Sequence, residues 1–255
     1  TGFAMVPVNA AGENSIIVSP GANAQFSPEM IREHESLFEA HDIIMLQLEI
    51  PIETVLEAAK LAKSYGKFVI VDPAPALAPE DMPVELFKYV DLMTPNKQEL
   101  QILAGQDGSL IDQAGILRGQ GISNLIVTLG EKGAYISTKD KAYIIPAVEV
   151  PVVDTTGAGD AFTAALAVGL GRGYALEKAV EFATRVAANV ITKLGAQTSV
   201  PTLDELDDWL IGKMTFDGGE FAEVKVTSDR ATGDESVDAA TMDSKVAEDE
   251  VTDNE

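Results

Sequence analysis

Apolar and polar positions alternate along most of this chain in the manner of strands followed by helices. Residues 43–48 form a short apolar run, residues 53–65 carry apolar side chains at helical spacing, and residues 68–71 are apolar again before Asp72. The remaining predicted elements are strands at 90–93 and 125–129, a hairpin of 133–137 with 143–146, and helices at 97–104, 111–119, 158–170 and 175–193. Repeated strand–helix–strand units predict an α/β fold, in which a central, mostly parallel sheet has helices on both faces.

Polar residues stand at the ends of three predicted strands. Glu49, Asn96 and Thr128 each follow or end an apolar run. In open parallel sheets, ligands bind beside the carboxyl ends of the strands. We therefore expect these three residues near a common ligand site.

The segment 154–160 reads Asp-Thr-Thr-Gly-Ala-Gly-Asp and stands directly before an apolar helical pattern. Free N–H groups and the positive end of the helix dipole favour an anion at such a place, and Gly157 and Gly159 let the backbone approach it closely. Asp160 would repel an anion, but its carboxylate could take a proton from a hydroxyl that attacks a phosphoryl group. The alternative is that the Asp caps the helix and the glycines only permit tight packing.

Seven motifs, in family order, resemble those of the ribokinase-type (pfkB) carbohydrate kinases over about residues 1–213. The segment 154–160 is similar to the C-terminal signature of that family. The other six are Pro-Gly-Ala-Asn at 20–23, Gln-Leu-Glu-Ile-Pro at 47–51, Pro-Ala-Pro-Ala at 73–76, Thr-Pro-Asn-Lys-Gln-Glu at 94–99, Thr-Leu-Gly at 128–130 and Gly-Ala-Gln-Thr-Ser-Val-Pro at 195–201. The resemblance implies a ribokinase-like fold and ATP-dependent phosphorylation of D-ribose to D-ribose 5-phosphate.

The same resemblance implies catalytic and substrate-binding roles. Asp160 would be the catalytic base that contacts the sugar hydroxyl, and Glu49 would also bind the substrate. The backbone amides of Gly157, Ala158 and Gly159 would form an anion hole for the transferring phosphoryl group.

Nucleotide and metal sites are implied in the same way. The implied nucleotide-binding residues are Asn96, Thr128, Leu129, Gly130, Glu131, Lys132, Gly133, Gly159, Asp160 and Thr184. Asn96 and Glu99 would hold Mg²⁺ through water, although the same pair also reads as an N-cap with a capping-box Glu. The implied K⁺ site consists of Asp154, Thr156, Val190, Lys193, Gly195 and Ser199. The expected cofactors are thus ATP as cosubstrate, Mg²⁺ and K⁺.

Composition limits the function classes. The 255 residues have a formal net charge of −23 and contain no cysteine, which excludes disulfides and thiolate metal sites. A strongly acidic surface argues against nonspecific binding to nucleic acid or anionic membranes, because repulsion would replace the gain from counterion release. No signal peptide or membrane span is apparent, so we expect a cytoplasmic protein.

Two regions differ from the central pattern. Thirteen acidic and three basic residues lie between 217 and 255, and we expect 214–255 to be a disordered acidic tail after a kinase domain of residues 1–213. Residues 3–8 and 15–19 predict two strands joined by a turn at 9–14, so that residues 1–24 would contribute part of a small β lid through which family members form homodimers.

The resemblance begins after the segment that binds sugar hydroxyls in this family. We therefore expect this chain to be the C-terminal part of a longer enzyme, which leaves its activity alone open. Asp72 stands where ribokinases commonly have Asn. The alternatives are another kinase of the family, acting on fructose, 2-keto-3-deoxygluconate or a nucleoside, or a catalytically silent nucleotide-binding fragment.

Overall fold

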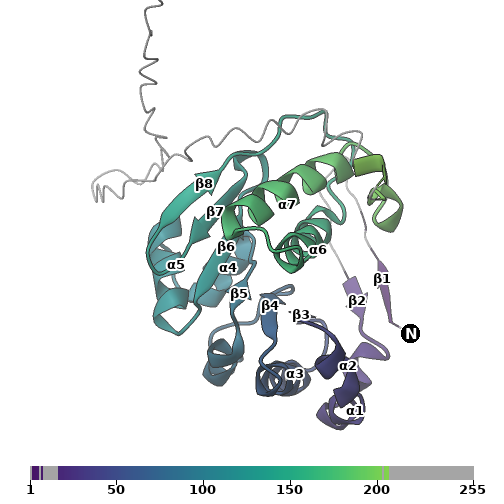
Figure 1. The fold of residues 1–255 in the computed structure, drawn as a ribbon, viewed down its shortest axis with the longest axis vertical. Helices are drawn as coiled ribbons and strands as arrows, with labels where there is room; N and C mark the ends of the chain where they lie inside the picture. The colour runs from purple at the N-terminus through teal and green to yellow at the C-terminus, as the bar shows by residue number, and fades with distance from the viewer. Residues whose placement is uncertain (1, 6, 8–16, 203, 207–255) are drawn as a thin grey trace, which may run out of the picture.

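The computed structural model describes residues 2–5, 7, 17–202 and 204–206 of the chain. Its centre is a six-stranded sheet with the strand order β3-β4-β5-β6-β7-β8 (Figure 1). The strands are β3 (Ile43–Gln47), β4 (Phe68–Asp72), β5 (Leu92–Met93), β6 (Asn124–Thr128), β7 (Ala134–Ser137) and β8 (Ala142–Ile145). The strands β3 to β6 are parallel, and the hairpin β7–β8 adds two antiparallel pairings. The predicted α/β sheet is confirmed.

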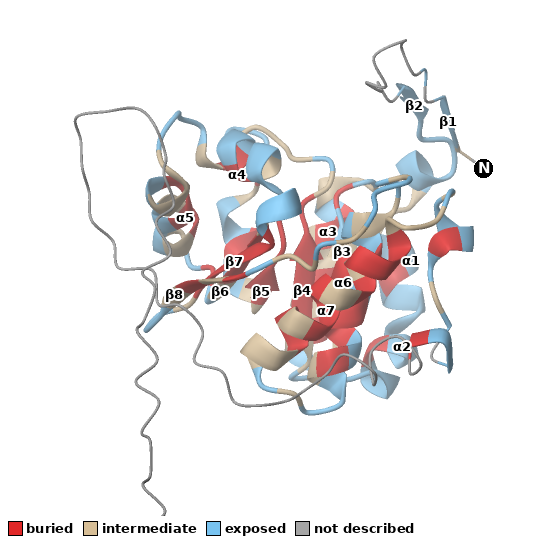
Figure 2. Ribbon diagram, turned by 90° about the horizontal axis from the view of Figure 1, so that it is seen from above, coloured by how far each residue is buried: buried red, intermediate tan, exposed pale blue. Residues whose placement is uncertain are grey.

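Helices cover both faces of the sheet (Figure 2). One face packs against α1 (Pro28–Glu33), α2 (Glu35–Ala40), α3 (Ile52–Ser64), the 3₁₀ helix η2 (Val84–Tyr89), α4 (Lys97–Ala104) and α5 (Leu110–Gly119). The other face packs against α6 (Ala158–Gly171) and α7 (Leu176–Val190). Shorter 3₁₀ helices are η1 (Asn23–Gln25), η3 (Gly130–Lys132) and η4 (Gln197–Ser199).

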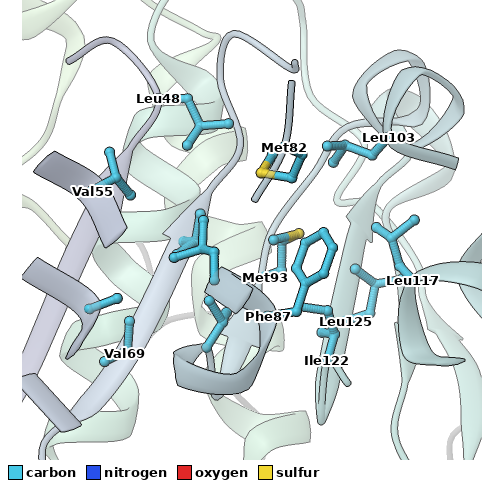
Figure 3. Packing of buried hydrophobic residues seen from close by; sticks show 14 of the residues in the cluster. Leu48, Val55, Val69, Met82, Phe87, Met93, Leu103, Leu117, Ile122 and Leu125 are labelled. Atoms are coloured by element: carbon cyan, nitrogen blue, oxygen red, sulfur yellow. The ribbon is translucent and has the colours of Figure 1, made fainter. Parts of the chain in front are cut away.

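The continuous apolar run of β4 reflects burial on both faces. Val69, Ile70 and Val71 are all fully buried; Val69 and Val71 belong to the core beneath α3, whereas Ile70 belongs to the core beneath α6 and α7. Successive strand residues point to opposite faces, so a central strand needs apolar side chains at every position. Figure 3 shows part of the larger core, in which Val55 and Val69 lie at one side of the picture and Leu125 of β6 at the other, with Met93 and Phe87 between them.

Two predicted elements are shorter in the structure. The 3₁₀ helix η2 takes the residues before 90, which leaves β5 with only Leu92 and Met93. The helix predicted at 175–193 ends at Val190. The Ile191 carbonyl instead accepts hydrogen bonds from the amides of Val153 (2.8 Å) and Asp154 (3.3 Å), so the chain after α7 is tied to the signature loop.

The predicted N-terminal strands pair as β1 (Phe3–Met5) and β2 (Ile17–Ser19), which are antiparallel and exposed along their whole length. They form a separate two-stranded sheet that projects from the body (Figure 2). The predicted turn at 9–14 and the predicted tail at 214–255 lie outside the described residues. Within the described ranges, no helix combines the length and the apolar character needed to cross a membrane.

Candidate active site

The signature segment forms the start of α6 as predicted, with one difference in detail. The N-cap is Gly157, which has φ 76° and ψ 3° and supplies no side chain to the cap. Only glycine adopts this left-handed conformation at little cost. Asp160 therefore lies within the first helical turn, and the alternative that it caps the helix is wrong. The amide of Ala158 donates to the Thr155 carbonyl at 3.2 Å, whereas Gly159 and Asp160 belong to the turn whose N–H groups lack intrahelical acceptors.

Asp160 lies beside the carboxyl ends of β3 and β4. The Gln47 Nε2 atom, on the last residue of β3, donates a hydrogen bond to Asp160 Oδ1 at 3.2 Å. Gln47 is paired in register with Asp72, the last residue of β4. Glu49 is exposed two residues beyond β3. Thus the topology brings Asp160 to the strand ends, as the ligand rule for parallel sheets requires.

Asp72 is the titratable group of this site with the largest shift. The pKa of Asp72 is raised to about 7, first by burial and then by the acidic charges of Glu99 and Asp160, while hydrogen bonds from Thr163 and Gln47 oppose the shift. Its Oδ2 atom accepts a hydrogen bond from Thr163 Oγ1 at 3.3 Å. The residue is only 8% exposed. Near neutral pH it exists in both protonation states.

A cavity of about 910 Å³ opens next to the start of α6. It lies between the turn after β6, the loop after β8, and the facing sides of α6 and α7. Its volume is within the range of small-molecule sites. The predicted residues that line it are Thr128, Gly130, Glu131, Lys132, Gly133, Ala158, Gly159 and Thr184. The three predicted nucleotide-binding residues Asn96, Leu129 and Asp160 are not part of the lining.

The cavity combines an apolar body with a few polar groups. Phe162, Ala187 and Ile191 contribute apolar surface, and Glu131 and Lys132 are exposed charged residues of its lining. Thr184 is 8% exposed, and its Oγ1 atom has no hydrogen-bond partner among the described residues. A buried hydroxyl without a partner costs free energy, which a ligand atom in the cavity would recover. This arrangement suits a largely apolar group that carries polar atoms at its edge.

Sequence reasoning missed a large part of this lining. The missed residues are Ala147, Val148, Glu149, Val150, Val152, Thr155, Phe162, Ala187, Ala188 and Ile191. Most belong to the loop between β8 and the signature, or to the sides of α6 and α7. The loop carries no motif of its own, and its position follows only from the antiparallel order of β7 and β8. Gln47 and Thr163, which frame Asp72, were also missed as site residues.

Asn96 and Glu99 form the predicted capping box. The Glu99 amide donates to Asn96 Oδ1 at 2.9 Å, and the Asn96 amide donates to Glu99 Oε2 at 2.7 Å. Burial raises the pKa of Glu99, while the hydrogen bond from Asn96 opposes the shift. A single parallel bridge pairs Asn96 with Thr128, so the capping box stands beside the cavity although it does not line it.

Asp154 joins two distant loops. Its Oδ1 atom accepts hydrogen bonds from the amide and the hydroxyl of Thr156 at 2.9 and 2.7 Å, and its Oδ2 atom accepts from the Gly195 amide at 3.0 Å. These bonds, with the Thr156 hydroxyl first, hold the pKa of Asp154 below its ordinary value. Three of the six residues implied for the K⁺ site are therefore in direct contact.

The other three residues of the implied K⁺ site lie close by in the chain. The Val190 carbonyl accepts from the Lys193 amide at 3.1 Å, and Ser199 Oγ donates to the Ala196 carbonyl at 2.6 Å. In the described part of the chain, no group of three or more His, Cys, Asp or Glu side chains could hold a metal ion. A cation here would thus depend mainly on backbone carbonyls and water.

Comparison with known proteins agrees with this geometry. Residues 1–203 match the family described as pfkB family carbohydrate kinase. The chain belongs to this family. As a pfkB carbohydrate kinase it is a phosphotransferase, and the resemblance inferred from its seven motifs is confirmed.

Three similar proteins are informative. The ribokinase of Haemophilus influenzae is 36% identical over 214 residues, which are 82% of this chain and 69% of that protein. The deoxyribokinase of Salmonella typhi is 38% identical over 214 residues, with the same coverage. The structure of Arabidopsis thaliana ribokinase complexed with ribose and ATP superposes with a TM-score of 0.73 at 31% identity, covering 82% of this chain and 69% of that one.

Proposed function

We propose that this pfkB kinase transfers the γ-phosphoryl group of ATP to the primary hydroxyl of D-ribose and yields D-ribose 5-phosphate. One observation carries the proposal: Asp160 and the amides of the first turn of α6 stand at the junction between the strand ends and the 910 Å³ cavity. A sugar over the strand ends and a nucleotide in the cavity would both reach this turn. The related Arabidopsis enzyme, which was solved with ribose and ATP, supports the choice of both ligands.

The residues of the turn divide the chemistry between them. Asp160 would accept the proton of the sugar hydroxyl as its oxygen attacks the γ-phosphorus and the bond to the ADP oxygen breaks. The backbone amides of Gly157, Ala158 and Gly159 would donate hydrogen bonds to the transferring phosphoryl group and stabilise its charge. The amide of Ala158 is partly engaged by Thr155, so the Gly159 amide is more available than that of Ala158.

The nucleotide would occupy the cavity. Thr128 and the turn 130–133 would contact the phosphates, because the left-handed Gly130 and Gly133 bring the backbone close without side chains. Thr184 would meet the base with its free hydroxyl. Asn96 stands next to Thr128 and would contact the phosphates through water.

Two cations fit residues that are present. Mg²⁺ would be held through water by Asn96 and Glu99, whose carboxylate and amide oxygens suit a hard cation, and it would neutralise charge on the phosphates. K⁺ would sit near Asp154 and the carbonyls around Val190 and Gly195, where Asp154 already connects the signature loop to residue 195. A bound K⁺ would order the loop that leads to the anion hole.

The exposed pair β1–β2 fits the expected lid over the sugar and a homodimer formed through it. In this proposal residues 1–213 form one kinase domain, and Glu49 contacts the sugar from the strand-end side. The matched residues span 69% of the Haemophilus relative.

A second candidate substrate is 2-deoxy-D-ribose. The deoxyribokinase of Salmonella typhi shares 38% identity with the chain, slightly more than the ribokinase of Haemophilus influenzae. The two sugars differ in one hydroxyl, and a site that hydrogen-bonds this hydroxyl discriminates strongly against the sugar that lacks it. Fructose, 2-keto-3-deoxygluconate and nucleosides remain acceptors to be tested.

The test is ATP-dependent ADP release with each of these acceptors, for the chain itself and for the chain extended through any upstream reading frame. We expect the highest kcat/KM with D-ribose, a rise on replacing Na⁺ by K⁺, and loss of turnover in Asp160→Asn. Preference for another acceptor would retain the mechanism and reject the substrate. Binding of ATP without turnover on any acceptor would favour a silent nucleotide-binding protein.

A further inference from the structure

Asp160 contacts a hydrogen-bonded group of side chains at the ends of β3 and β4. Asp72, at the end of β4, accepts from Thr163 Oγ1 at 3.3 Å, and Thr163 follows Asp160 by three residues on the same face of α6. Gln47, the register partner of Asp72, donates to Asp160 at 3.2 Å. Thr94 completes the group, with its hydroxyl 3.3 Å from that of Thr163. Two carboxyl groups, those of Asp72 and Asp160, thus flank one amide.

The groups around Asp72 do not make its buried carboxyl a source of stability for the fold. The charged groups that act on it are Asp160 from α6 and Glu99 from α4, and both are acidic. Its neighbours from β3, from α6 and from the end of β5 are the uncharged Gln47, Thr163 and Thr94. Burying a carboxyl next to like charges costs free energy. A purely structural role would be served better by an apolar or amide side chain.

The Gln47 amide explains what Asp72 can do. An amide carries two N–H donors at one end and an acceptor oxygen at the other. When Asp72 is ionised, only the NH₂ end of Gln47 can face both carboxylates, so one N–H is aimed at Asp160 Oδ1, as observed. When Asp72 is protonated, its own O–H can donate to the Gln47 oxygen, and the amide can turn over. In that orientation Asp160 loses its donor.

We propose that Asp72, whose carboxyl is anchored by the Thr163 hydroxyl, is a positioning residue for Asp160 and acts on it through the orientation of the Gln47 amide. The proposal rests on the proposed function, because it takes Asp160 as the base. Ionised Asp72 fixes the Asp160 carboxylate in one rotamer with its second oxygen free for the sugar hydroxyl. Protonated Asp72 releases it. Since burial raises the pKa of Asp72 to about 7, this control operates in the neutral range.

The kinetic test compares wild type, Asp72→Asn, Gln47→Leu and the double variant across the neutral pH range. Misplacing a catalytic group costs rate rather than binding, so we expect Gln47→Leu to lower kcat about tenfold with little change in KM for ATP. Wild-type kcat should rise several-fold as pH increases through about 7, the pKa of Asp72, and Asp72→Asn should remove this rise. Because Asp72 acts through Gln47, the double variant should have the same kcat and the same pH profile as Gln47→Leu. The effects of the two substitutions on kcat should therefore not be additive.

Glu80→Gln is the matched control, because it removes one negative charge at an exposed position. It should retain the wild-type pH profile. A pH profile of Asp72→Asn that matches the wild type, or a double variant in which the two losses multiply, would overturn the proposal.

A second measurement does not depend on turnover. In protein labelled with ¹³C at aspartate side chains, the Asp160 Cγ signal is identified by its absence in Asp160→Asn. We expect this signal to shift through an inflection near pH 7 in the wild type and to lose the inflection in Asp72→Asn and in Gln47→Leu. If the Asp160 signal shows the same pH dependence in the wild type and in both variants, the positioning role is rejected. If no sugar is phosphorylated, or if Asp160→Asn stays active, the proposed function fails while this titration still decides the coupling.

Discussion

The turn between β6 and β7 allows a matched test of how closely the chain is packed around the cavity. Gly130 and Gly133 both have positive φ, of 61° and 93°, and both line the cavity. A Cβ atom on Gly130 would meet nothing within 4 Å. A Cβ atom on Gly133 would lie 2.0 Å from the Ile145 carbonyl oxygen and 2.6 Å from the Ala147 nitrogen. The two alanine variants therefore share a positive φ, and only Gly133→Ala adds a steric clash.

The expected magnitudes follow from these contacts. The left-handed conformation costs a residue with a Cβ about 1–2 kcal/mol, and the smaller entropy of the unfolded alanine chain returns roughly half of a kcal/mol. Gly130→Ala should thus lower the free energy of unfolding by about 1 kcal/mol. Gly133 has ψ −130°, a region that is almost restricted to glycine, and the clashing atoms are backbone atoms that cannot rotate away. Strain and overpacking together predict a loss of roughly 3–5 kcal/mol for Gly133→Ala.

Urea denaturation followed by circular dichroism measures the difference. Both variants should keep the wild-type m-value, and the midpoint of Gly133→Ala should be much lower than that of Gly130→Ala. A folded domain typically has a free energy of unfolding of about 5–15 kcal/mol, so a loss of this size would remove a large part of the stability. If the two variants unfold within about 1 kcal/mol of each other, which is less than the predicted overpacking cost, the close approach of the turn to residues 145–147 is refuted.

Four further predictions concern single side chains. Thr184→Val should change the free energy of unfolding by less than about 1 kcal/mol, because the hydroxyl has no partner among the described residues, and should raise KM for ATP several-fold. Asn96→Ala should destabilise the protein by about 1 kcal/mol through loss of the cap. Glu99→Gln preserves the capping box, so urea midpoints should stay close to wild type while the Mg²⁺ concentration for half-maximal activity rises. Hydrogen bonds lower the pKa of Asp154 below its ordinary value of 3.8, so the ionised carboxylate stabilises the fold above that pH, and this stabilisation is lost as pH falls through the lower pKa of the folded state. Asp154→Asn should therefore have a lower melting temperature than the wild type at pH 7, and the difference should disappear in acid. The variant should also lose activation by K⁺.

Local patterns in the sequence were enough to predict most of the fold. The run Val69–Val71 predicts a strand buried on both faces because every residue of such a strand meets a core. The capping box at Asn96 and Glu99 and the helix after Gly157 depend on groups at most a few residues apart, so the chain encodes them directly. The family signature carried the expected position of the base in the same way. Boundaries that depend on distant partners, such as the end of α7 at Val190, were predicted less well.

Only the tertiary structure decided how the site is assembled. Gln47 and Asp160 are 113 positions apart, and they meet because β3 pairs with β4 while α6 crosses the same strand ends. The loop 147–152 lines the cavity because β7 is antiparallel to β6 and β8 is antiparallel to β7, so that β8 ends at the same edge of the sheet as β6. The raised pKa of Asp72, on β4, likewise needs burial and two acidic neighbours, which come from α4 and α6. Strand and helix propensities act within a few residues, whereas strand order and packing bring together groups that no local pattern connects.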